Sequence, residues 1–317
     1  MWMRPILWII LSMGHKMNTQ GPEYVRIPSA ITLVSGETAR THLNRLLTSN
    51  ISKDQFLSRR HSVICNLNGR ITSYQLHADL GEQILLVHGD SVSHNLRNNL
   101  TTGVSWNETV NVSIGDGAIH RMLVYGKGSE IVIKNLGINV NHLNSVSWVE
   151  YNDSMISLID ADDGTPIYEL LVPTRELSDL IMNLEDFGVI EGKKDTAVAL
   201  QSSKGIIDSS INLSGNNPLH LRLTEIVDLK KGCYPGQEIH ARMESRDAIK
   251  KTLSTFRSNR QLSIGRHKTS NGLRVEVISS DQFTEEWINL IVHPRDLSPD
   301  PAINLQIDDE LISCHLV

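Results

Sequence analysis

The chain has 317 residues, with 30 Lys and Arg against 36 Asp and Glu and a formal net charge of -6 at pH 7. Hydrophobic residues make up 40% and charged residues 21%, a composition typical of a folded globular protein that excludes a disordered or fibrous chain. The negative charge also argues against a general nucleic-acid-binding protein, because phosphates would be repelled over most of the surface. The length suggests two or three domains.

The first residues differ from the rest. Residues 1–13 combine Arg4 with an apolar run, as a signal peptide does, but the run is too short for a bilayer and lacks a small-residue cleavage site. We interpret residues 1–22 as a disordered extension or a mis-assigned start. A poor signal or anchor and an ordered helix are the other interpretations. No other stretch is apolar enough to span a membrane, so we predict no membrane partner.

The cysteines indicate the compartment. The chain has three cysteines, Cys65, Cys233 and Cys314, which lie far apart in the sequence. An odd number of cysteines argues against a disulfide framework, and their wide spacing argues against a paired-cysteine zinc site. We therefore predict a reducing, cytoplasmic location and no metal site.

The first half of the chain alternates short strands and helices. Residues 31–34 are predicted as a strand followed by a helix over residues 39–47. Asn68-Gly69 lies between two strand-like runs, which predicts a hairpin with a type I′ turn. Residues 83–88 form a further strand, and Asp90 begins a helix.

A similar order follows about 85 residues later. Residues 155–160 and 167–172 flank Asp162-Asp163-Gly164, which predicts a second hairpin, and Thr174 begins a helix that ends near Gly188. Two interpretations are open: a duplicated hairpin-and-helix unit, or an α+β domain in which such units simply recur.

The last part of the chain is different. Short runs of alternating apolar residues separated by turn residues predict a small all-β domain, a barrel, over residues 241–317. Residues 23–240 then form two α+β subdomains.

One segment, residues 230–238, carries most of the functional information. Pro235 and Gly236 at the middle of Tyr234–Gln237 predict a type II turn. If the backbone before it is extended, Lys231 and Cys233 point to one face, and the ammonium would lower the pKa of the thiol. The alternative is an ordinary turn before a barrel strand, with Cys233 as a small buried apolar residue.

The residues after Cys233 offer contacts to a ligand. Glu238 can accept hydrogen bonds from a heterocycle with N–H donors, such as a pterin, and Gln237 adds an amide. Arg242 can attract a carboxylate, or it is an ordinary exposed charge. Tyr234 either stacks on a ring or packs under the turn.

Lys231 to Glu238, KGCYPGQE, resembles the signature of the YgfZ family of folate-binding proteins, relatives of the glycine cleavage T-protein, an aminomethyltransferase. Residues 31–36, 43–50 and 68–71 resemble upstream segments of that family, and Gly205 and Asn217-Pro218 also match. The resemblance spans roughly residues 24–260.

The resemblance implies an α+β, aminomethyltransferase-like folate-binding fold of three domains around a central opening, the last a β-barrel. It implies tetrahydrofolate or another reduced folate as cofactor, in the central site. From their chemistry we predict Tyr234, Gly236, Gln237, Glu238 and Arg242 as the residues that bind it. It further implies a role in assembly or repair of iron–sulfur proteins, which would be partners. Cys233, with Lys231 beside it, is the predicted reactive pair.

Two departures from the family bear on activity. Aminomethyltransferases carry a folate-activating aspartate where this chain has Ser73 and Tyr74, neither of which is a carboxylate base; Asp79 is the nearest alternative. Gln201 stands where relatives have an arginine. Three hypotheses follow: a folate-binding accessory protein, a folate-dependent aminomethyltransferase, and an interaction protein that has lost the ligand.

Overall fold

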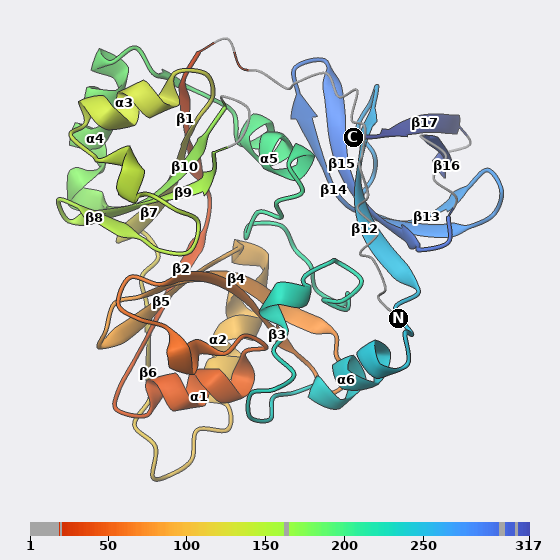
Figure 1. Cartoon of the computed structure of the whole chain (residues 1–317), viewed down its shortest axis with the longest axis horizontal. Coiled ribbons are helices and arrows are strands. Elements are labelled where there is room, and N and C mark those ends of the chain that lie inside the picture. Colours follow the sequence, from red (N-terminus) through yellow and green to blue (C-terminus); the bar gives the residue numbers. More distant parts are fainter. Residues whose placement is uncertain (1–18, 20, 162–164, 298–301, 308–309) are drawn as a thin grey trace, which may run out of the picture.

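The computed structural model describes residues 19, 21–161, 165–297, 302–307 and 310–317. These residues form three lobes, two built from a sheet with helices and one built as a closed barrel (Figure 1). The predicted α+β class with a C-terminal barrel is confirmed. Most of the predicted N-terminal extension, and the predicted turn at 162–164, lie outside the described residues.

The first lobe is a five-stranded sheet in the order β3-β4-β5-β2-β6, in which all neighbours are antiparallel. Leu43 and Leu47 from the first helical segment and Leu96 and Leu100 from the second pack into one core on one face of this sheet. Its elements are β2 (Ala30–Ser35), α1 (Ala39–Leu46), β3 (Arg59–Cys65), β4 (Ile71–Asp79), β5 (Gln83–His88), α2 (Ser93–Thr101) and β6 (Asn111–Ile114), with 3-10 turns at Ile51–Lys53 and Asp90–Val92.

The second lobe is a six-stranded sheet in the order β11-β1-β7-β10-β9-β8. Helices α3 and α4 cover its outer face, where Ile133, Leu180 and Leu184 are buried. Its elements are β1 (Glu23–Ile27), β7 (Ile119–Tyr125), α3 (Ser129–Asn135), β8 (Val149–Tyr151), β9 (Ser154–Asp160), β10 (Ile167–Pro173), α4 (Thr174–Asp186) and β11 (Ile190–Glu191), with a 3-10 turn at Val140–His142.

The two lobes exchange their first strands. β1 precedes β2 in sequence but pairs with β7, whereas β6 precedes β7 but pairs with β2. The strand orders β3-β4-β5-β2-β6 and β8-β9-β10-β7-β1 are therefore the same arrangement built twice. This repeat supports the duplication interpretation, and the exchange ties the lobes together while covering strands that would otherwise be open edges.

The barrel closes in the order β12-β15-β14-β13-β16-β17. It begins at β12, so the predicted boundary at 240/241 falls inside the helix α6 that precedes it. Helix α5 lies between the second lobe and the barrel, and α6 lies at the lower right (Figure 1). The remaining elements are α5 (Lys194–Ser203), a 3-10 turn at Thr224–Ile226, α6 (Gln237–Ser245), β12 (Lys251–Ser258), β13 (Gly265–Thr269), β14 (Arg274–Phe283), β15 (Glu286–Pro294), β16 (Ala302–Ile307) and β17 (Glu310–Leu316).

The lobes share buried surface. The two sheets meet at a core that contains Leu76, Leu85, Trp148 and Leu171. A second shared core joins β3 and β4 to the outer face of the barrel. No helix among the described residues is long and apolar enough to cross a membrane.

Candidate functional site

The loop that carries the signature is held by a tight turn. The Gln237 N–H donates to the Tyr234 carbonyl at 3.2 Å, and Gly236 has φ of 84° and ψ of -1°. These are the hydrogen bond and the third-position dihedrals of a type II turn, so that prediction is confirmed. The turn leads directly into α6, which begins at Gln237.

Gly236 is required by its contacts as well as by its dihedrals. A Cβ at this position would lie 2.6 Å from the Cα of Gly69 and 2.7 Å from the carbonyl oxygen of Asn66. The signature turn therefore packs directly against the tip of the β3–β4 hairpin. Only a glycine allows the two backbones to approach this closely.

The hairpin itself differs from the prediction in its turn type. The Gly69 N–H donates to the Asn66 carbonyl at 2.9 Å, and Gly69 has a φ of 66°, whereas Asn68 is not among the residues with positive φ. The predicted type I′ turn, which needs positive φ at both central residues, is therefore wrong. The Asn66 side chain stabilises the alternative because its Oδ1 accepts from the N–H groups of Asn68 and Arg70.

A third segment completes this junction. The Gly69 carbonyl accepts from Asn217 Nδ2 at 3.0 Å and from His240 Nε2 at 3.1 Å. Burial lowers the pKa of His240, so its neutral ring donates from Nε2. The hairpin, the Asn217 loop and α6 thus meet at one carbonyl.

Lys231 is buried and anchors the loop to the first lobe. Its Nζ donates to the carbonyls of Asn44 at 2.5 Å, Leu47 at 2.5 Å and Ser49 at 2.8 Å, and only 8% of the residue is exposed. The Asn44 carbonyl belongs to the last turn of α1, where carbonyls lack partners within the helix. Burial lowers the pKa of Lys231 to about 8, while the three carbonyls favour the ammonium form.

Lys231 and Cys233 do not share one environment. The backbone bends at residues 231 and 232 rather than running extended, and Lys231 is buried while Cys233 is exposed. The prediction that the two side chains share a face depended on an extended backbone, so the structure contradicts it. Cys233 is also not the small buried residue of the alternative interpretation.

Tyr234 packs inside the loop. Its ring lies 5.3 Å from the Lys231 ammonium, a cation–π contact, and the residue is 6% exposed. Its hydroxyl has no hydrogen-bond partner among the described residues. Burial, followed by the nearby Cys65 thiol, raises the pKa of that hydroxyl. Tyr234 was predicted either to stack on a ligand ring or to pack under the turn, and in the structure its ring packs under the turn.

Gln237 faces the inside of the loop, whereas Glu238 and, further along α6, Arg242 face solvent. Gln237 Nε2 donates to the carbonyls of Leu229 and Lys231, both at 3.3 Å, and so closes the loop on itself. Glu238 and Arg242 lie on the surface of α6 and pair with each other at 2.5 Å, with 75% and 59% of their side chains exposed. The outward groups are therefore Cys233, Glu238 and Arg242.

A buried cluster that the sequence analysis did not identify lies where the two sheets and the segment after α5 meet. Glu169 accepts from Arg121 Nε at 2.5 Å and from Arg59 Nε at 2.9 Å. Asp208 accepts from both terminal nitrogens of Arg121, at 2.9 and 2.8 Å. We call Arg59, Arg121, Glu169 and Asp208 the central ion cluster.

The central ion cluster is satisfied internally. Asp208 also accepts from Gln201 Nε2 at 2.9 Å and from the Ser210 N–H at 2.8 Å. Burial works against the ionised carboxyl of Asp208, but Arg121 and these hydrogen bonds hold its pKa well below its usual range. Gln201, which stands where relatives have an arginine, thus donates a hydrogen bond to a carboxylate of the protein itself.

The central ion cluster and the signature loop lie apart. Arg59 is the first residue of β3, and Cys65, which lies beside Tyr234, is the last. Six residues of strand span about 20 Å. The Arg59 end of the cluster and the signature loop therefore lie at opposite ends of β3.

The alternative carboxylate is also engaged elsewhere. Asp79 pairs with Arg40 at 2.5 and 3.0 Å, on the side of the sheet that faces α1. Ser73 is buried, and the Tyr74 hydroxyl donates to the Ile207 carbonyl at 3.0 Å. Ser73 and Tyr74 stand where aminomethyltransferases carry the folate-activating aspartate, and neither is a carboxylate base. Asp79 does not replace that aspartate, because it is paired with Arg40.

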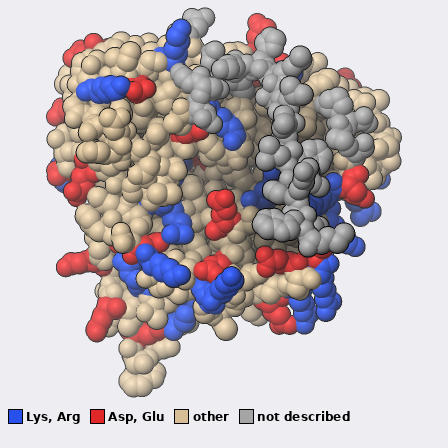
Figure 2. All heavy atoms as spheres, in the orientation of Figure 1, with Lys and Arg blue, Asp and Glu red and all other residues tan. Residues whose placement is uncertain are grey.

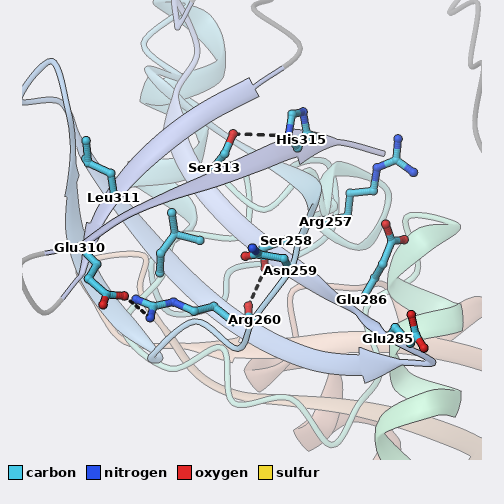
Figure 3. Close-up of a pocket in the computed structure, with 11 residues that line it drawn as sticks. Arg257, Ser258, Asn259, Arg260, Glu285, Glu286, Glu310, Leu311, Ser313 and His315 are labelled. Atoms are coloured by element: carbon cyan, nitrogen blue, oxygen red, sulfur yellow. Dashed lines mark hydrogen bonds and ion pairs between the residues drawn. The ribbon is translucent and has the colours of Figure 1, made fainter.

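A surface pocket of about 690 Å³ lies at the seam of the barrel between β12 and β17 (Figure 3). Arg260 and Glu310 pair across it, and Ser313 Oγ lies 3.3 Å from His315 Nε2. None of the residues predicted for the site lines this pocket. Among the described residues, no group of three His, Cys, Asp or Glu is placed to hold a metal ion.

Comparison with known proteins identifies the fold. No protein-family model matches the chain, and no curated protein matches it in sequence. The crystal structure of glycine cleavage system aminomethyltransferase T from Bartonella henselae superposes with a TM-score of 0.77 at 15% identity, covering 95% of this chain and 86% of that one. The chain therefore has an aminomethyltransferase-like fold, as predicted.

Two further solved structures resemble the chain only weakly. A heterotetrameric sarcosine oxidase from Corynebacterium sp. U-96 gives a TM-score of 0.35 at 9% identity, over 54% of this chain and 88% of that one. An aspartate kinase from Synechocystis gives a TM-score of 0.24 at 8% identity, over 87% of this chain and 40% of that one.

Proposed function

We propose that this protein is a reduced-folate-binding accessory protein of the cytoplasm that supports assembly or repair of iron–sulfur proteins, as the resemblance to the YgfZ family implies. The observation that carries the proposal is the construction of the KGCYPGQE loop. Lys231, Tyr234, Gly236 and Gln237 all hold the loop in place, and Cys233 is left exposed at its outer side. The aminomethyltransferase-like fold agrees with this proposal.

The residues near Cys233 fit one end of a reduced folate. Such a ligand presents N–H donors on its heterocycle and carboxylates on its tail. Glu238 and Arg242 supply an acceptor and a cation, and their mutual ion pair is exposed, so exchanging it for ligand contacts costs about 0–1 kcal/mol. Gln237 is committed to the loop through its amide nitrogen and fits less well.

The central ion cluster fits a reduced folate poorly. The oxygens of Asp208 accept four hydrogen bonds and those of Glu169 accept three, so these carboxylates have little capacity for ligand N–H groups. Opening the cluster would leave buried arginine charges without partners, which costs several kcal/mol. We therefore place the heterocycle at α6 and not at the cluster.

Aminomethyl transfer is the less favoured activity. It needs a carboxylate that activates the folate nitrogen. Ser73 and Tyr74 provide none, Asp79 is paired with Arg40, and Glu169 and Asp208 are held ionised by arginines. An accessory role in which Cys233 contacts a client protein, and folate binds beside it, requires no such base.

Calorimetry with 5-formyl-tetrahydrofolate tests the folate site. We expect micromolar binding that weakens at least fivefold in Glu238→Gln. The matched control is Glu244→Gln, a second exposed glutamate of the same helix, which should bind as wild type does. Equal affinities for the two variants would show that the heterocycle does not lie at Glu238.

A second candidate function follows from the satisfied central cluster. An interaction protein that has kept the fold and lost the ligand would fill its centre with its own ion pairs, as Arg121 and Gln201 do around Asp208. This candidate predicts no folate binding by folded protein at millimolar concentration, together with a stable protein partner in a pull-down.

A further inference from the structure

One face of the barrel carries a row of cations. Arg266 and Lys268 are exposed on β13, Arg274 is exposed on the neighbouring strand β14, and Lys251 begins β12. These four residues line a surface cavity of about 770 Å³, which we call the basic groove. In the space-filling view, Lys and Arg side chains lie along the lower right of the molecule, below the barrel and around α6, with Asp and Glu side chains among them (Figure 2).

Two of these cations oppose each other in the sheet. The register of β13 and β14 places Lys268 directly opposite Arg274. Side chains that face each other across antiparallel strands lie about 5 Å apart, and like charges in such pairs destabilise the sheet. An anion bound between the two would remove that repulsion, so this pair itself indicates a ligand.

The groove contains little negative charge of its own. Among the described residues that line it, Glu276 is the only one with a carboxylate, and this carboxylate lies 3.9 Å from Arg266. Among the described residues, Lys251, Lys268 and Arg274 have no ion-pair partner. Four cations against one carboxylate is a local excess in a chain whose net charge is -6.

The groove is connected to the signature loop through direct contacts. Asn216 Nδ2 donates to Glu276 in the groove at 3.4 Å, and its neighbour Asn217 donates to the Gly69 carbonyl, which also binds His240 of α6. Arg70, next to Gly69, and Lys251 both lie close enough to His220 to help lower its pKa, after burial, to about 4. Positive charge thus continues from the hairpin to the groove.

We propose that the basic groove binds the oligo-γ-glutamyl tail of a reduced folate. The inference rests on the proposed folate site at α6 and extends it to the rest of the ligand. Each γ-glutamyl unit carries one carboxylate, so a tail distributes charge along a chain, as the groove distributes its cations over three strands. A single compact anion would instead need cations converging on one point.

Nucleic acid is a poorer occupant. Its binding is driven by many phosphate contacts over a large positive surface, whereas the described residues that line this groove supply four cations. An acidic segment of a partner protein shares the chemistry of the tail, and the experiment below separates the two.

The test compares 5-formyl-tetrahydrofolate with one and with five glutamyl units, by calorimetry at low salt. We expect the pentaglutamyl form to bind wild type about tenfold more tightly, a difference of about 1.4 kcal/mol. The double variant Lys268→Gln, Arg274→Gln should lose this gain while binding the monoglutamyl form unchanged. Lys127→Gln, an exposed lysine of the second lobe, is the matched control and should keep it.

The outcomes separate the inference from the proposed function. If the monoglutamyl form binds and the pentaglutamyl form binds no better, the tail inference is wrong and the folate site stands. If neither form binds, the folate site itself is wrong, and the inference falls with it. In that case an α-linked pentaglutamate peptide that binds wild type but not the double variant would assign the groove to an acidic protein segment.

A second readout does not depend on any ligand. Because Lys268 opposes Arg274, Lys268→Gln should raise the Tm of the unliganded protein at low salt, and 0.5 M NaCl should abolish the difference. A lower Tm at low salt would show that the two cations are not in conflict, and the argument for a bound anion would fail.

Discussion

Replacing Lys231 by methionine tests whether the signature loop is held as the structure indicates. The substitution keeps an unbranched side chain of similar length and removes the ammonium. The carbonyls of Asn44, Leu47 and Ser49 then lose their donor in a buried setting. We expect the loop to detach from α1 and the protein to lose stability.

The magnitude follows from two opposing effects. Three hydrogen bonds to a charged donor contribute about 1.5–3 kcal/mol each, so about 5–9 kcal/mol is lost. The ammonium also carries a desolvation cost, because burial lowers its pKa from 10.5 to about 8; removing the ammonium returns about 3 kcal/mol. We expect a net decrease of about 3 kcal/mol in the free energy of unfolding.

Urea denaturation of Lys231→Met and Lys230→Met provides the comparison. Lys230 is the exposed neighbour in the same loop, so its variant should differ from wild type by less than about 0.5 kcal/mol. Hydrogen exchange over residues 228–240 should accelerate in Lys231→Met alone. Equal stabilities and equal exchange in the two variants would refute the anchoring role of Lys231.

Three further substitutions test other parts of the structure. In urea denaturation, Gly236→Ala should lower the free energy of unfolding by about 3 kcal/mol. The added Cβ would lie 2.6 Å from the Cα of Gly69, and residue 236 has a φ of 84°, which is unfavourable for alanine. A decrease below 1 kcal/mol would mean that the turn can move away from the hairpin. Tyr234→Phe should be neutral or up to about 1 kcal/mol more stable, since it deletes a buried hydroxyl without a partner; a clear loss would reveal a partner. Burial raises the pKa of Asp281 to about 6, above its unfolded value near 3.9, so the native state binds more protons between these pH values. As pH falls from 7 to 4, the free energy of unfolding of wild type should therefore rise by up to about 2–3 kcal/mol relative to that of Asp281→Asn. If the free energies of unfolding of the two proteins changed with pH in parallel, this prediction would be contradicted.

Local patterns in the sequence were sufficient to predict most elements of the fold. The strand predicted at residues 83–88 is β5, the helix predicted from Thr174 is α4, and Gly188 follows it with a φ of 78°. Each of these depends on periodicity and on turn residues within a few positions. The exchange of β1 and β6 between the lobes was not predicted, because it depends on pairing between segments about 90 residues apart.

The candidate site was predicted only in part for the same reason. The type II turn at Pro235-Gly236 depends on neighbours in sequence and is confirmed. The partners of Lys231 lie more than 180 residues earlier in the chain, so nothing in the loop itself shows that this lysine points away from Cys233. Side chains two residues apart share a face only in extended backbone, and the backbone bends at residues 231 and 232.

The central ion cluster left a signal in the sequence that was not used. Glu169 stands in an otherwise apolar strand, and Arg121 precedes the apolar run of β7. Charged residues at such positions are buried only when they are paired, so each of them predicts an opposite charge nearby. The identity of that partner depends on tertiary structure.

Reactivation of an oxidatively damaged iron–sulfur enzyme tests the central claim most directly. In an assay that supplies ferrous iron, sulfide and a thiol reductant, purified wild type with reduced folate should speed the recovery of enzyme activity. Cys233→Ala should not, although it binds 5-formyl-tetrahydrofolate with unchanged affinity and unfolds at the same urea concentration. Full restoration by Cys233→Ala would show that the exposed thiol has no part in the function, and would contradict the proposal.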